Sequence, residues 1–337
     1  MGTSDADLPG PRRGRRRTLA GVRCVILDDY QGVATALGPW SDLPGVEVTA
    51  VREHLAGEEA VAAAAGDADI LVVMRERTPL TASLLARLPR LRLVVTSGMR
   101  NASIDLAACR ERGVTVCGTG SSSTPPVELT WALVLGLARH LVPESTAFRE
   151  GGPWQSTVGV DLAGATLTLI GLGKIGTRVA AVAGAFGMDV VAWSPHLTPE
   201  RAEAAGVRFA PSLSAALGEA DFVSLHLVLS DSTRGLLGAE ELAMIRPTAY
   251  LVNTSRSGLV DTGALVAALQ EGRIAGAGLD VHDEEPLPAD HPLRRLPNVL
   301  ATPHLGYVTR RNYDTYFTEA VEDVAAWLAG APVRRLD

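Results

Sequence analysis

The sequence has few cysteines, and their arrangement excludes two classes of protein. The 337 residues include three cysteines, Cys24, Cys109 and Cys117, and no two of them form a CxxC pair. An odd and sparse count does not build a disulfide framework and is typical of a reducing compartment. No cluster of histidine, cysteine or aspartate shows the spacing of metal ligands. We therefore expect a cytoplasmic protein that has no disulfides and binds no metal.

Aromatic residues and long apolar runs are also scarce. Aromatics make up 4% of the chain, whereas apolar residues as a whole make up 47%. That mixture fits alternating strands and helices rather than an all-β sandwich. No apolar run approaches the ~20 residues that a membrane span needs. The net charge of −7 argues against a nucleic-acid surface covering the whole protein. We expect neither a membrane nor a nucleic acid as partner.

The first 17 residues differ from the rest of the chain. They are polar, contain glycine and proline, and end in a cluster of arginines. No apolar segment long enough for a signal peptide follows them. The composition predicts a disordered, solvated basic tail, and the alternative is a segment that binds nucleic acid or another anionic surface.

Short runs of β-branched residues alternate with alanine-rich amphipathic stretches along the remaining chain. Strands separated by helices imply parallel pairing through crossovers, and the length suits two domains. A loop-like stretch at 120–126 separates the two sets of strands. The predicted strands are 22–28, 46–51, 70–74, 93–96, 114–116, 166–170, 189–193, 222–226, 249–253, 276–280 and 299–301. The predicted helices include 58–65, 81–87, 127–141 and 312–328.

A glycine-rich turn follows the predicted strand 166–170. Gly171, Gly173 and Gly176 form the pattern G-x-G-x-x-G where this strand meets an alanine-rich helix. The first glycine permits a tight turn, the second lets backbone approach a pyrophosphate, and the third lets the helix pack close to the strand. The amide groups of Lys174 and Ile175 would face the anion. The context predicts a dinucleotide-binding turn, and the alternative is a glycine-rich turn in an unrelated α/β domain.

The next strand lacks the acid that usually binds the ribose of NAD. That acid is expected roughly 20 residues after the glycines, at the end of the strand. Ser194 holds the position, and Asp189 opens the strand at its far end. Ser194, His196 and Arg201 could accept a 2′-phosphate, although no arginine directly follows the strand. The choice between NAD and NADP therefore stays open.

Three later segments complete a recognisable pattern. They are Asn253-Thr254-Ser255-Arg256, Gly278-Leu279-Asp280-Val281 with a following Glu285-Pro286-Leu287, and Thr302-Pro303-His304-Leu305-Gly306. In this order, after the glycine turn, they resemble the D-isomer-specific 2-hydroxyacid dehydrogenases. The resemblance covers nearly the whole chain after the tail. It implies two Rossmann-like, doubly wound parallel-sheet α/β domains around a cleft, and hydride transfer between NAD(P)(H) and a small 2-hydroxy or 2-keto acid.

The resemblance also implies a catalytic trio. Oxidising a secondary alcohol requires removal of its hydroxyl proton as the hydride leaves carbon, and a histidine suits this task. In the family this is the histidine of the TPHLG segment, here His304, and its partner carboxylate is here Glu285. The arginine that binds the substrate carboxylate is here Arg256. Each residue taken alone could be an ordinary loop or surface residue, and it is their joint occurrence that predicts catalysis.

Further cofactor positions follow from the same motifs. Asp280 matches the acid that receives the nicotinamide carboxamide, and Thr254 lies at the nicotinamide end. The segment that begins at His226 is expected to line the cofactor site through Leu227 and Thr233, and it has Val228 where the family usually has proline. The remaining histidines, His54, His140, His196, His282 and His291, are predicted to be surface or cap residues.

Substrate contacts are expected from the first domain. Arg75 follows a predicted strand and resembles a family loop that faces the substrate. Ser97, Gly98, Met99 and Arg100 resemble a loop whose backbone N–H groups hold the substrate carboxylate. Arg100 replaces a family glycine, so the identity of the substrate stays open.

The implied domain arrangement is discontinuous. Residues 18–124 and 305–337 would form the substrate-binding domain, and residues 125–304 the NAD(P)-binding domain. The predicted helix 127–141 would connect them, and such helices commonly build a homodimer in this family. The alternative function is a non-catalytic NAD(H) sensor of the same fold, like the family's corepressors. Turnover of 2-keto acids would discriminate between the two.

Overall fold

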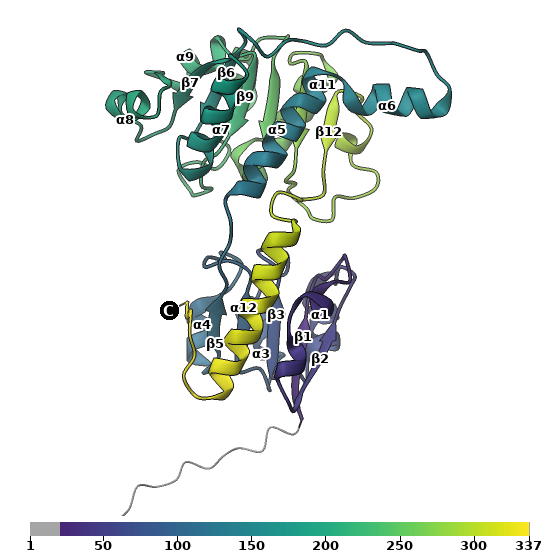
Figure 1. The fold of residues 1–337 in the computed structure, drawn as a ribbon, viewed down its shortest axis with the longest axis vertical. Helices are drawn as coiled ribbons and strands as arrows, with labels where there is room; N and C mark the ends of the chain where they lie inside the picture. Colours follow the sequence, from purple (N-terminus) through teal and green to yellow (C-terminus); the bar gives the residue numbers. More distant parts are fainter. Residues whose placement is uncertain (1–20, 337) are drawn as a thin grey trace, which may run out of the picture. The chain divides into compact units, whose positions relative to one another are not determined.

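The computed structural model describes residues 21–336, so the predicted tail of residues 1–17 lies outside the described residues. The chain forms two compact units. Among the described residues, the first unit contains 21–120 and 314–336, and the second runs from Ser121 to Tyr313. Figure 1 traces the elements of each unit.

The first unit is built on a parallel sheet with the strand order β2-β1-β3-β4-β5. Its strands are β1 (Val22–Ile26), β2 (Val46–Ala50), β3 (Ile70–Val73), β4 (Leu93–Thr96) and β5 (Thr115–Gly118). Its helices are α1 (Ala34–Leu37), α2 (Gly57–Ala65), α3 (Ala82–Ala86), α4 (Leu106–Glu111) and the part of α12 (Arg310–Leu328) that starts at Asp314. Every residue of β3 and β4 is buried, as expected for a parallel sheet with both faces covered.

The second unit contains a larger parallel sheet with the order β12-β11-β10-β9-β6-β7-β8. Its strands are β6 (Thr166–Ile170), β7 (Asp189–Trp193), β8 (Arg208–Phe209), β9 (Phe222–Leu225), β10 (Tyr250–Asn253), β11 (Gly276–Leu279) and β12 (Val299–Ala301). Its helices are α5 (Thr124–Ala138), α6 (Leu141–Glu150), α7 (Lys174–Ala185), α8 (Pro199–Ala204), α9 (Leu213–Gly218), α10 (Ala239–Met244) and α11 (Thr262–Gln270). The strand order reverses beside β6, the strand that precedes the glycine turn.

Helices cover both faces of the second sheet. Leu133 of α5 and Val179 of α7 belong to one apolar cluster, and α5 and α7 lie on the same side of the sheet in Figure 1. Leu217 of α9, Leu242 of α10 and Leu265 of α11 belong to another. The prediction of two doubly wound parallel-sheet units is therefore confirmed.

The helix predicted at 127–141 has different bounds in the structure. It begins at Thr124, so Pro125 and Pro126 stand in its first turn, where proline costs no hydrogen bond. It ends at Ala138 because His140 adopts a left-handed conformation, with φ of 49°. The predicted loop 120–126 was therefore wrong for its last three residues, which belong to α5. The helix α6 was not predicted. Between residues 21 and 336, no helix is both long and apolar enough to cross a bilayer.

All three cysteines are buried, and none of them forms a disulfide. Burial raises the pKa of Cys24 to about 12 and that of Cys109 to about 11. Because the thiolate is the reactive form, these two side chains serve as core residues and not as nucleophiles.

Candidate active site

The strands of the second unit end together along one edge of the sheet. The parallel register aligns the last residues of six strands, which are Ile170, Trp193, Leu225, Asn253, Leu279 and Ala301. The loops that follow these strands therefore leave the same edge, where open α/β sheets place their ligands. These loops carry the catalytic and cofactor residues predicted in this unit.

The glycines of the turn after β6 are required for different reasons. Gly171 has φ of 110°, and a Cβ there would lie 2.6 Å from the carbonyl oxygen of His226. A Cβ on Gly176 would overlap the carbonyl oxygen of Gly171. A Cβ on Gly173 would meet no atom within 4 Å, so the space beside it is open. The turn therefore has an open side at the start of α7, where Lys174 and Ile175 are the first residues.

The end of β7 carries no acid. Ser194 is half-buried, and its carbonyl accepts the amide of Leu197 at 3.1 Å. Asp189 lies at the opposite end of β7, where Arg208 binds it with a guanidinium–carboxylate distance of 2.6 Å. That ion pair commits Asp189 to the amino edge of the sheet, so it cannot serve as the ribose acid.

The loop after β9 is closed by Thr233. Its hydroxyl oxygen accepts the amide of Ser230 and donates to the carbonyl of Val228, both at 2.8 Å. The carbonyl of Leu227 accepts the hydroxyl of Ser255 at 2.6 Å, which ties this loop to the one after β10. Leu227 and Thr233 therefore shape the loop, while the Val228 side chain is 75% exposed at the sheet edge.

Arg256 stands in a loop that its neighbours hold firmly. The side chain of Asn253 accepts the amide of Ser255 at 3.0 Å and donates to the carbonyl of Arg256 at 2.9 Å. The Arg256 guanidinium donates to the carbonyl of Ser255 at 2.7 Å. Thr254 shares a 2.8 Å hydroxyl–hydroxyl hydrogen bond with Thr130 of α5. The arginine is half-buried at the sheet edge.

His304 and Glu285 meet although they lie 19 positions apart in the chain. The Nδ1 atom of His304 lies 2.7 Å from Oε2 of Glu285, and their side chains are 18% and 23% exposed. The other carboxylate oxygen of Glu285 accepts the backbone amide of His282 at 3.0 Å. The ring of Tyr307 packs edge-on against His304, with 5.6 Å between ring centres. This arrangement fixes the orientation of the imidazole and leaves Nε2 as the nitrogen that does not face the carboxylate.

Asp280 anchors the turn that carries His304. It is fully buried, and its carboxylate accepts the Thr302 hydroxyl and the amide of Leu305, both at 2.6 Å, and the amide of Gly306 at 2.8 Å. Burial raises the pKa of Asp280, and these hydrogen bonds oppose the shift. The contact to a nicotinamide carboxamide that the motif implies would have to share these oxygens.

His282 does not lie on the surface, which corrects the prediction for this residue. It is half-buried, its Nε2 lies 3.1 Å from the carbonyl oxygen of Thr302, and its Nδ1 is buried without a hydrogen-bond partner among the described residues. It thus bridges the loops that carry Glu285 and His304. A histidine before three acids gave no sequence signal for this role, since the contact joins the loops after two different strands.

His226 is a second half-buried histidine at the same edge. Its Nε2 lies 2.9 Å from the Ser224 hydroxyl, and burial lowers its pKa to about 4. It is therefore neutral at physiological pH. Its backbone and Cβ lie beside Gly171 and Gly176, so it packs against the glycine turn. Across residues 21–336, no three histidine, cysteine or acidic side chains gather as metal ligands would.

In the first unit, the loops after β3 and β4 interlock. Arg75 has φ of 53°, and its amide donates to the Ser97 hydroxyl at 2.9 Å. The Arg75 guanidinium lies over Gly98, where a Cβ would overlap its Nη1 atom. Gly98 therefore makes room for the Arg75 side chain.

The backbone amides of the β4 loop are partly committed. Those of Ser97 and Gly98 donate, each at 3.1 Å, to the carbonyl of Val73 and to the hydroxyl of Thr119. Met99 and Arg100 are exposed. The backbone anion site predicted for this loop thus rests on Met99 and Arg100 more than on the two residues before them.

The chain is similar in sequence to known proteins. Residues 131–306 match the model of the D-isomer specific 2-hydroxyacid dehydrogenase NAD binding domain. The chain is 38% identical to D-3-phosphoglycerate dehydrogenase of Methanocaldococcus jannaschii over 78% of this chain and 50% of that protein. It is 40% identical to glyoxylate reductase of Aeropyrum pernix over 73% of this chain and 76% of that protein.

A solved structure shows the same similarity. The crystal structure of a putative D-3-phosphoglycerate dehydrogenase oxidoreductase from Ralstonia solanacearum superposes with a TM-score of 0.88 and 37% identity, covering 94% of this chain and 96% of that one. This chain spans about half the length of the Methanocaldococcus jannaschii phosphoglycerate dehydrogenase. The chain belongs to the D-isomer-specific 2-hydroxyacid dehydrogenase family.

Proposed function

We propose that this chain is an NAD(P)-dependent oxidoreductase that transfers a hydride between the cofactor and a small D-2-hydroxy acid or 2-keto acid. The observation that carries the proposal is the 2.7 Å contact between His304 Nδ1 and Glu285 Oε2 at the sheet edge where the glycine turn also opens. Family membership supports the same reaction class.

The proton transfer is assigned to His304. During oxidation its Nε2 atom takes the proton of the substrate hydroxyl, and during reduction it returns that proton to the carbonyl oxygen. Glu285 holds Nδ1, so Nε2 is the nitrogen that exchanges the proton. Arg256 binds the substrate carboxylate and polarises the carbonyl through its fixed planar charge.

The residues of the second unit fit a dinucleotide. The open side of Gly173 and the amides of Lys174 and Ile175 suit a pyrophosphate at the start of α7. Ser194 would lie toward the ribose, Leu227 and Thr233 would line the middle of the cofactor, and Thr254 and Asp280 would lie at the nicotinamide end. The bound cofactor supplies or accepts the hydride.

Turnover tests the proposal directly. Purified protein should oxidise NADH or NADPH when mixed with at least one member of a panel of small 2-keto acids, including glyoxylate, pyruvate and hydroxypyruvate. Absorbance of the reduced nicotinamide reports the rate. Binding of NADH without turnover on any member of the panel would contradict an enzyme of this class and would point instead to a sensor.

The absence of an acid at Ser194 predicts measurable use of NADPH. An acid there would repel the 2′-phosphate, and Ser194→Asp should therefore shift the preference toward NADH by restoring both the ribose contact and the repulsion. The ratio of kcat/KM values for the two cofactors measures the effect. If the wild type already rejects NADPH by more than about a thousandfold, another residue supplies the exclusion.

Arg100 is proposed to select substrates with a second polar or anionic group. The side chain is exposed on a loop that resembles the substrate loop of the family. Loss of a charge-assisted hydrogen bond typically weakens binding by about one to two orders of magnitude. Arg100→Gly should therefore lower kcat/KM by that factor for hydroxypyruvate or a dicarboxylic keto acid. The rate with glyoxylate, which has no second group, should barely change. Equal losses on both substrates, or none on either, would show that Arg100 does not contact the far end of the substrate.

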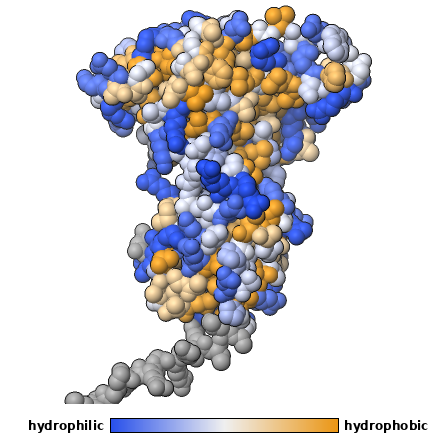
Figure 2. Space-filling view, viewed as in Figure 1, coloured by the Kyte–Doolittle hydropathy of each residue, from blue (hydrophilic) through white to orange (hydrophobic). Residues whose placement is uncertain are grey.

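We further propose a homodimer built by the segment around α6. None of the α6 side chains is buried, and Phe148 and Trp154 contact each other while remaining 68% and 82% exposed. Figure 2 shows further apolar surface over the α5 side of this unit. Leu141 and Val142 of α6 are also exposed. A contiguous group of exposed apolar side chains usually marks an interface. Light scattering during gel filtration should give twice the mass of one chain, and a monomer at micromolar concentration would contradict the assignment.

A further inference from the structure

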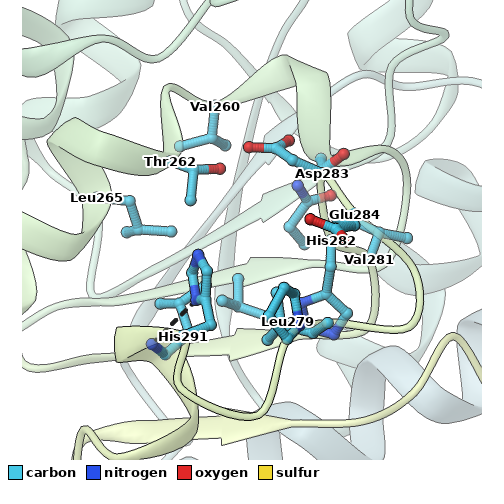
Figure 3. A pocket seen from close by; sticks show the side chains of 14 residues that line it. Val260, Thr262, Leu265, Leu279, Val281, His282, Asp283, Glu284 and His291 are labelled. Carbon is cyan, nitrogen blue, oxygen red and sulfur yellow. Dashed lines mark hydrogen bonds between the residues drawn. The ribbon is translucent and has the colours of Figure 1, made fainter.

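A crevice of about 140 Å³ lies in the second unit between the loop after β11 and the start of α11. Figure 3 shows Val260, Thr262 and Leu265 on one side of it, facing His282, Asp283 and Glu284. The volume is close to the ~150 Å³ of an apolar cavity that holds one benzene molecule. The crevice therefore has room for one ring or a short aliphatic chain.

The walls of the crevice combine an apolar interior with negative charge. Val260, Leu265 and Leu279 are buried residues of the interior wall. Asp283 and Glu284 are exposed acids on the loop side. The lining, as far as the described residues show, contains no lysine or arginine. An apolar body with one positive charge is the ligand chemistry that such walls complement.

The same loop carries Glu285, the partner of His304 in the proposed proton relay. His282 lines the crevice, its amide donates to Glu285, and its ring lies beside the carbonyl of Thr302, two residues before His304. Its buried Nδ1 lacks a partner among the described residues, so the ring is not fully held in place. A ligand that contacts Asp283 and Glu284 would therefore act on the turn that presents Glu285 to His304.

We propose that this crevice is a regulatory site for a small primary amine with an apolar body, and that its occupancy raises kcat by holding the 282–285 turn. The coupling to kcat rests on the proposed dehydrogenase function, whereas the binding does not. An ammonium group between the two acids would stabilise the turn in the conformation that keeps Glu285 on the imidazole.

Calorimetry with the full chain tests binding separately from turnover. The probes are benzylamine and benzyl alcohol, which have the same number of heavy atoms and differ in charge. Benzylamine should bind with a dissociation constant on the order of 1 mM, since a ligand of this size makes few contacts. The paired change Asp283→Asn and Glu284→Gln should weaken it about tenfold or more. The control pair Glu200→Gln and Glu203→Gln removes the same charge from α8 and should leave binding unchanged.

Leu287→Trp provides an uncharged test, because it fills the crevice without altering the acids and should abolish benzylamine binding. Binding of benzyl alcohol as tight as that of benzylamine, or binding that survives the paired change, would overturn the site. Saturating benzylamine should raise kcat at least about twofold in the wild type and have no effect in the paired variant. An unchanged kcat with the amine demonstrably bound would refute the coupling. An enzyme without turnover would refute the proposed function while the calorimetric result still decides the site.

Discussion

Replacing His304 with glutamine is expected to lower kcat by at least ~10²-fold while the affinity for the reduced cofactor changes little. A glutamine amide can still donate to Glu285, but it cannot take up or release a proton at physiological pH. General acid–base catalysis typically contributes 10²–10⁴-fold, and its loss falls on kcat because the proton moves in the transition state. Initial rates with saturating substrate and fluorescence titration of NADH measure the two quantities.

A matched histidine change gives the control for this experiment. His54 is exposed in the first unit, so His54→Gln should leave kcat within about twofold of the wild type. Glu285→Gln keeps the shape of the partner side chain and removes its charge, so it should lower kcat less than His304→Gln does. Normal turnover by His304→Gln would remove His304 from the reaction.

The second large effect is expected at the glycine turn. In Gly176→Ala the new Cβ would overlap the carbonyl oxygen of Gly171, which is backbone and cannot rotate away. Relief requires the turn or the start of α7 to move, and overpacking of this kind typically costs about 1–3 kcal/mol of stability. The displaced turn should also bind NADH at least about tenfold more weakly, since its amides would no longer point together. Chemical denaturation and NADH titration measure the two losses.

Substitutions at two other glycines distinguish an effect on stability from an effect on cofactor binding. A Cβ on Gly173 would meet no atom of the chain, so Gly173→Ala should leave the free energy of unfolding nearly unchanged and weaken only cofactor binding. Gly184, inside α7, also has open space, so Gly184→Ala should raise stability by about 0.5–1 kcal/mol and leave NADH binding intact. If Gly173→Ala binds NADH as the wild type does, the pyrophosphate does not lie at this turn.

Local patterns predicted the bounds of four strands. The bounds of β4, β6, β7 and β12 agree with those expected from runs of apolar residues between turn signals. Burial is continuous along β4 and along β6 after its first residue, as expected in a parallel sheet covered on both faces, so these strands stand out in the sequence. β12, the last strand at one end of the sheet, has no buried residue, and it was predicted from its apolar run alone. The two-residue strand β8 was missed because Arg208 and Phe209 form too short a run to stand out.

Helix ends were harder to predict because tertiary context decides them. The stretch from Thr124 to Pro126 has the composition of a loop, although it forms the first turn of α5. Proline is common both in loops and in the first turn of a helix, so the two prolines do not show where the helix begins. His140 breaks the helix by its backbone conformation, which a histidine adopts only when the surrounding structure favours it.

The sequence by itself determined the chemistry that this protein has at its disposal: the glycine turn after a strand, the arginine after another, and the histidine and glutamate after two more. Each motif is local, and its residues follow strands whose carboxyl ends must meet in a parallel sheet. Only the tertiary structure decided how those residues are held. The three hydrogen bonds of Asp280, the bridge of His282 to Thr302 and the crevice beside it join segments about 20 residues or more apart in the chain, and no local pattern encodes such contacts because they depend on how neighbouring strands pack.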